Sequence, residues 1–64
     1  MQKLMEIEVG SRWKHYNGIE YEVILITNLE NSEKYPTTVV YKGLNGKIWS
    51  RFLSGWERSF KKIN

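Results

Sequence analysis

Trp49 and Arg51 are the residues whose types and spacing best suit ligand binding, because they stand two apart in the alternating segment 47–52. Residues two apart on a β-strand share a face. On such a face a guanidinium can hold an anion while the indole stacks on a base or sugar. Tyr41 extends this face if its strand pairs onto the same side. The pair predicts an anion site, and a cation–π contact between the two with no ligand is the alternative.

His15 is the single histidine of the chain, and Tyr16 follows it. A general base needs a group that orients it and a nucleophile or water to act on, and the sequence places neither beside His15. The chain also lacks a pair of histidines or cysteines at metal-ligand spacing. We therefore interpret His15 as a polar, hydrogen-bonded member of a sheet wall. The alternative is that His15 and Tyr16 contact the ligand together with Trp49.

Catalytic motifs are missing from the chain. It has no glycine-rich phosphate loop, no nucleophile motif and no pair of carboxylates at a defined spacing. Without cysteine it has neither a thiolate nucleophile nor a disulfide. The sequence therefore predicts a protein that is not an enzyme and that uses no metal or cofactor.

The elements that position these residues are short strands. The longest apolar and β-branched run, 19–28, predicts the central strand, and its loss of alternation at 23–26 predicts that both faces are covered there. Asn17-Gly18 predicts a two-residue hairpin, with both residues at positive φ, that joins this strand to one at 12–16. Further segments read as a loop at 29–36, strands at 37–41, 47–52 and 60–63, a turn at 43–46 and a helical turn at 53–58 with Ser54 as its cap.

This pattern indicates an all-β fold. We predict a small SH3-like, partly open antiparallel barrel of five or six short strands, with one short helical turn before the last strand. Residues 10–64 form the single barrel domain, and residues 1–9 are a lead-in segment or edge strand with Leu4, Ile7 and Val9 toward the core. Because a chain of 64 residues has little core to spare, Trp13, Tyr21 and Trp56 are expected inside.

Charge is unevenly distributed along the chain. The formal net charge is +3, and most of the acidic residues precede residue 31. From Lys34 onward Glu57 is the one acidic residue among seven basic ones, which include Arg51, Arg58, Lys61 and Lys62. The second half therefore carries a positive field that attracts anions, unless its lysines serve only to protect edge strands from pairing.

An ordered set of short motifs carries a resemblance to a known family. It comprises Gly10, the segment 13–18 (WKHYNG), Tyr21-Glu22-Val23, Val39-Val40-Tyr41, Gly46 and Trp49-Ser50-Arg51. Together they resemble a family of small bacterial and phage proteins described only as a domain of unknown function. Phe52 departs from the pattern, which has proline at that position. The loop before the Val39-Val40-Tyr41 strand also departs from it, because this loop ends in Tyr35-Pro36. The resemblance implies a compact β fold of prokaryotic or phage origin and brings no agreed activity.

These observations predict a non-catalytic binding module. It would recognise an anionic ligand, either a nucleotide-like small molecule or single-stranded nucleic acid, through Trp49, Arg51, Tyr41, His15 and Tyr16. The alternative is a phage accessory or anti-defence protein that sequesters a signalling nucleotide as a homo-oligomer, or that docks on a host protein through an apolar patch such as Tyr35, Leu44 and Trp56. No signal peptide or membrane span is visible, so we expect a cytoplasmic protein that does not bind membranes.

Overall fold

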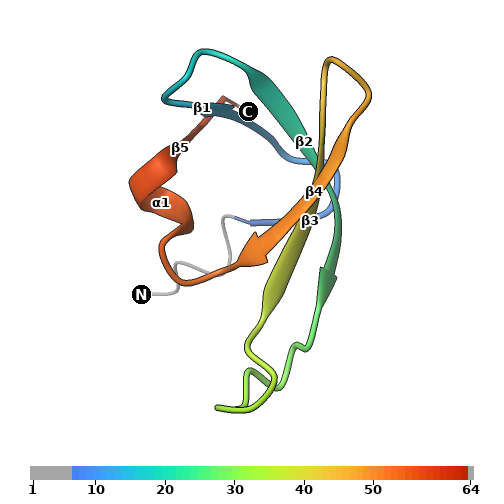
Figure 1. Cartoon of the computed structure of the whole chain (residues 1–64), viewed down its shortest axis with the longest axis vertical. Helices are drawn as coiled ribbons and strands as arrows, with labels where there is room; N and C mark the ends of the chain where they lie inside the picture. The colour runs from blue at the N-terminus through green and yellow to red at the C-terminus, as the bar shows by residue number, and fades with distance from the viewer. Residues whose placement is uncertain (1–6, 64) are drawn as a thin grey trace.

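Five strands and one helical turn make up the fold, which a computed structural model describes for residues 7–63 (Figure 1). In chain order the elements are β1 (Arg12–His15), β2 (Glu20–Thr27), β3 (Thr38–Gly43), β4 (Ile48–Phe52), α1 (Trp56–Ser59) and β5 (Phe60–Lys62). The strands form one antiparallel sheet in the order β4-β3-β2-β1-β5. The edge strands β4 and β5 do not pair with each other, so the predicted all-β, partly open architecture with a helical turn before the last strand is confirmed.

Two hairpins, β1–β2 and β3–β4, share one turn geometry that differs from the predicted one. Gly18 N donates to His15 O at 2.8 Å, and Gly46 N donates to Gly43 O at 2.9 Å. Both glycines have positive φ, of 92° and 86°, whereas the asparagine before each does not. The prediction of a two-residue turn with both residues at positive φ is therefore wrong. Each hairpin has the longer loop in which glycine alone supplies the left-handed position.

The second half of β2 does not have two covered faces, contrary to the prediction. The register against β3 shifts between Val23 and Leu25, which marks a bulge at Ile24. Val23 is buried, whereas Ile24 and Leu25 are exposed. The extra residue bends the strand and leaves Ile24 and Leu25 exposed, while Ile26 still packs against the core.

The core lies between the concave side of the sheet and α1. Trp56 of α1 stacks on Phe60 at 3.9 Å between ring centroids and meets Trp13 and Tyr41 edge-on at 5.7 and 5.1 Å. Trp13, Tyr21 and Trp56 are all buried, as predicted. Figure 1 shows α1 on the open side of the curved sheet, between β5 and the end of β4. Its Trp56 is buried.

The prediction for the lead-in residues is confirmed in part, and the predicted cap of α1 is wrong. Of the lead-in residues expected in the core, Ile7 is buried and Val9 is exposed, while Leu4 lies outside the described residues. Ser54 does not cap α1, because the cap residue is Gly55 and no side-chain hydrogen bond is made there. α1 spans four residues, so no helix within 7–63 is long enough to cross a membrane.

Candidate functional site

Trp49 and Arg51 share a face of β4, as their spacing predicts, but this face points to the core side of the sheet. Trp49 pairs with Tyr41 and Arg51 with Val39, both of which are buried. The other face carries Ile48 and Phe52, which are 62% and 55% exposed. The indole and the guanidinium therefore lie on the inner face of β4 and not on the outer one. Trp49 is nevertheless 48% exposed, because β4 is the edge of the sheet.

Arg51 spans the gap between the two edges of the sheet. Its Nη1 donates to the Ser59 Oγ at 3.0 Å, and its Cζ lies 5.3 Å from the centre of the Phe60 ring. Its Nε is buried and has no partner within residues 7–63. The Arg51 side chain thus links β4 to the α1–β5 segment, although β4 and β5 do not pair through backbone hydrogen bonds. The same contacts hold the guanidinium in place without a carboxylate.

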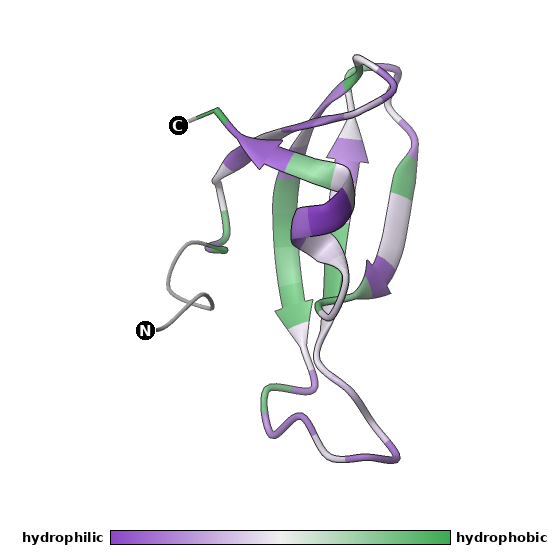
Figure 2. Ribbon diagram, turned by 90° about the vertical axis from the view of Figure 1, so that its left-hand side faces the viewer, coloured by the Kyte–Doolittle hydropathy of each residue, from purple (hydrophilic) through white to green (hydrophobic). Residues whose placement is uncertain are grey.

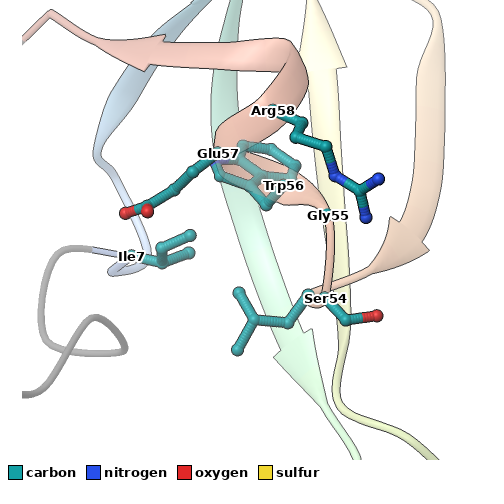
Figure 3. Close-up of a pocket in the computed structure, with 7 residues that line it drawn as sticks. Ile7, Ser54, Gly55, Trp56, Glu57 and Arg58 are labelled. Carbon is teal, nitrogen blue, oxygen red and sulfur yellow. The ribbon is translucent and has the colours of Figure 1, made fainter.

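A hollow of about 410 Å³ lies between the end of β4 and α1, with Arg51 on one side and Arg58 on the other. Ser54, Gly55 and Ser59 complete most of its wall. The Arg58 guanidinium lies over the backbone of Gly55, where an added Cβ would come within 3.2 Å of an Nη atom (Figure 3). Gly55 has φ of 88°, so glycine suits this position for its conformation as well as for its size. The hollow offers two guanidinium groups and two hydroxyl groups to an anion.

A second hollow of about 300 Å³ adjoins the first and shares Arg58 and Ser59 with it. Its wall includes Lys14, Lys61 and Tyr16, and Glu57 is its one carboxylate. Lys14 and Lys61 are direct cross-strand partners in the β1–β5 pair. Like charges directly opposite each other destabilise a sheet, so this pair favours a bound anion over the empty state. We call Lys14, Arg51, Arg58 and Lys61 together the basic surface.

Within residues 7–63 no ion pair to a carboxylate neutralises the basic surface. The ion pair found there joins Arg12 to Glu20, at 3.6 Å between Nη2 and Oε1, and it involves none of these four cations. The residues of that range also contain no group of three or more histidine, aspartate or glutamate side chains that could hold a metal ion.

His15 and Tyr16 lie beside the second hollow. The Nδ1 of His15 accepts a hydrogen bond from Asn17 N at 3.1 Å, and its ring meets Phe60 edge-on at 4.8 Å. His15 is thus a hydrogen-bonded residue of the sheet wall, as its interpretation from the sequence has it. Tyr16 is 81% exposed, and its ring packs against that of His15 at 4.2 Å between centroids, so most of the residue is open to a ligand.

Three of the five predicted contacts therefore gather around Arg58, namely Arg51, His15 and Tyr16. Tyr41 does not join them. It is only 7% exposed, and its ring packs against Tyr21, Trp56 and Phe60 in the core. Trp49 lies two residues before Arg51 and lines neither hollow. The predicted stacking face of Trp49 with Tyr41 does not exist at the surface.

Sequence reasoning missed Arg58, Lys14 and Lys61 as members of the site. The excess of basic residues in the second half includes Arg58 and Lys61, and that signal could have found them. Lys14 carries no such signal, because only the pairing of β1 with β5 brings it next to Lys61.

The apolar patch proposed around Tyr35, Leu44 and Trp56 is also absent. Trp56 is buried, while Tyr35 lies in the β2–β3 loop and Leu44 in the β3–β4 turn. The loop precedes β3 and the turn follows it. The two side chains therefore lie at opposite ends of that strand and do not form one surface.

Comparison with known proteins gives one result. No curated protein and no solved structure matches the chain. A family model described as "Protein of unknown function (DUF1653)" matches residues 11–62, which include every strand, α1 and all four residues of the basic surface. The chain therefore belongs to the DUF1653 family of proteins of unknown function.

Proposed function

We propose that this domain is a non-catalytic module that binds single-stranded nucleic acid on the basic surface. The observation that supports it best is the gathering of four cations around two adjoining hollows, with Lys14 directly opposite Lys61 and none of the four in an ion pair with a carboxylate of residues 7–63. Such a cluster costs stability unless an anion neutralises it. The bacterial or phage origin and the cytoplasmic location predicted from the sequence belong to the same proposal.

The chemistry of the wall suits phosphate groups. Arg51 is held by Ser59 and Phe60, so its guanidinium loses little freedom when an anion arrives. Guanidinium groups bind phosphate oxygens with paired N–H donors, and hydroxyl groups such as that of Ser54 can donate a further hydrogen bond.

A chain of phosphates fits this surface better than one phosphate group does. The cations are distributed over both hollows, on either side of Arg58, and do not converge on one point. Tyr16, largely exposed beside the second hollow, offers a face on which a base can stack. Stacking of this kind contributes about 1–3 kcal/mol per base and depends little on the base.

Binding of a labelled oligothymidylate of about 10 nucleotides, followed by fluorescence anisotropy at low salt, tests the proposal. Arg58→Ala removes the cation shared by both hollows, and we expect it to weaken binding by about tenfold or more. Lys42→Ala is the matched control, because Lys42 is an exposed cation of β3 that lines neither hollow. The affinity of Lys42→Ala for the oligonucleotide should stay within about twofold of that of the parent.

Two results would contradict the proposal: no binding of the oligonucleotide at low salt, or equal losses in the two variants. Titration of a mononucleotide in parallel distinguishes the ligand classes. If the mononucleotide binds as tightly as the oligonucleotide, the ligand is a nucleotide-like small molecule and not a strand.

A further inference from the structure

The outer edge of β4 is unpaired. Gly43 N donates to Lys47 O at 2.9 Å and Leu53 N to Thr37 O at 2.8 Å, so the odd-numbered residues of this segment direct their backbone groups toward β3. In an antiparallel ladder the residues between them direct N–H and C=O the other way. Ile48, Ser50 and Phe52 therefore point their backbone groups away from the sheet. Figure 2 shows β4 as the outermost strand, with its free side on the right.

This edge has few of the features that prevent pairing with another chain. Protected edges are short, kinked by bulges or proline, carry lysine, or hold an inward-pointing charge, and of these β4 has the last, Arg51, whose guanidinium contacts Ser59 and Phe60. The opposite edge, β5, fits that description, with three residues that include Lys61 and Lys62. β4 has five residues, no proline and no register shift against β3. Its outward side chains are Ile48, Ser50 and Phe52, which are uncharged and exposed.

We propose that a second copy of this chain pairs with β4 edge to edge, in antiparallel orientation, about a two-fold axis at Ser50. Such an axis makes the same strand serve both sides of the contact. Ser50 would face Ser50 of the partner copy, and Ile48 would face Phe52 of the partner copy on either side of the axis. The two open sheets would join into one, and the inference holds whether or not the basic surface binds nucleic acid.

The residues of β4 select this register over its neighbours. Centred on Ser50, all three outward residues of each copy meet outward residues of the other, and no basic residue of β4 lies opposite a basic residue of the partner copy. A shift that centres the axis on Arg51 puts two arginines opposite each other. A shift that centres it on Trp49 puts Arg51 opposite Lys47. Both shifts also leave outward backbone groups unpaired, so charge and hydrogen bonding favour the same arrangement.

The size of the contact predicts a weak dimer. Ile48, Trp49 and Phe52 each keep roughly half or more of their surface exposed. With the strand backbone, their burial gives on the order of 500 Å² per copy, below the ~800 Å² per partner of a standard interface. The association should therefore be reversible and concentration-dependent.

Sedimentation equilibrium from about 10 μM to 1 mM measures this association, and Ser50→Pro tests the edge. Proline removes the outward N–H of Ser50, which β3 does not use, so the fold should persist while the dissociation constant rises by about tenfold or more. Leu25→Lys is the matched control. Leu25 is an exposed apolar residue of β2, away from the edge, and its substitution disrupts stacking of sheet faces but not edge pairing.

A mixing experiment tests the register even if the proline variant does not fold. Ile48→Lys and Phe52→Glu should each weaken self-association. An equimolar mixture of the two should associate more tightly than either alone, because the introduced lysine of one copy then faces the introduced glutamate of the other. The inference is overturned if the parent is monomeric throughout the range or if Leu25→Lys weakens the dimer as much as Ser50→Pro. It is also overturned if the equimolar mixture associates no more tightly than either variant alone.

Discussion

The number of cations on the basic surface sets how steeply binding of a single strand depends on salt. Each phosphate neutralised on single-stranded DNA contributes about −0.7 to the slope of log K against log salt concentration. Four contacts, from Lys14, Arg51, Arg58 and Lys61, predict a slope of about −2.8. Raising salt from ~50 to ~200 mM should then weaken binding about 50-fold.

Removing one of these cations changes that slope by a definite amount. In Arg58→Ala three contacts remain, so we expect a slope of about −2.1 and a loss of about 20-fold over the same range of salt. The assay is anisotropy of the labelled oligonucleotide at about five salt concentrations, fitted for the parent, Arg58→Ala and Lys42→Ala. Lys42 lines neither hollow, so the slope of its variant should equal that of the parent.

The slopes can refute the assignment of the surface independently of absolute affinity. A parent slope no steeper than about −1 would mean that most of these cations do not contact phosphate. An equal reduction of the slope in Arg58→Ala and Lys42→Ala would mean that binding follows net charge and not this surface.

Three further predictions concern the fold that holds the site. Gly43→Ala should lower the free energy of unfolding by about 1–3 kcal/mol, because the added Cβ would lie 2.9 Å from Cε2 of Tyr21. Chemical denaturation measures this loss, and the double variant with Tyr21→Leu should lose less stability than the sum of the two single variants. Ser11→Ala should cost about 1–3 kcal/mol in the same assay, because it leaves the buried Trp13 Nε1 without its acceptor at 2.9 Å, and an unchanged midpoint would contradict this. Arg51→Met should change stability by less than about 1 kcal/mol, because loss of the Ser59 hydrogen bond is offset by removal of a buried, unpartnered Nε, yet it should weaken oligonucleotide binding; a large fall in the melting temperature would refute that balance.

Much of the fold follows from short-range patterns in the chain. The alternation around Trp13 and in segment 47–52 is local, and each Asn-Gly pair lies next to the strands it joins, so strands and hairpins could be assigned without tertiary information. The aromatic core could also be predicted, because so small a domain has few other residues with which to fill its interior. The φ values inside the turns were not predictable to that level, since Asn-Gly suits more than one hairpin loop.

The direction in which a strand faces could not be decided locally. In β4 both faces contain large side chains, Ile48 and Phe52 on one and Trp49 and Arg51 on the other, so periodicity identifies the two faces without saying which is inner. The pairing with Val39 and Tyr41, and the presence of α1 on that side, decide it. The bulge at Ile24 likewise arises from the register with β3, which the sequence of β2 alone does not specify.

The sequence by itself determined the strands, the hairpins, the aromatic core and the surplus of positive charge, because each depends on neighbouring residues or on composition. Only the tertiary structure decided which cations form a site. The pairing of β1 with β5 joins the first and last strands and sets Lys14 opposite Lys61, and the Arg51 contact with Ser59 brings β4 to the same place. Contacts between residues so far apart in sequence leave no periodic signal, so the basic surface exists only once the sheet has curled around Trp56.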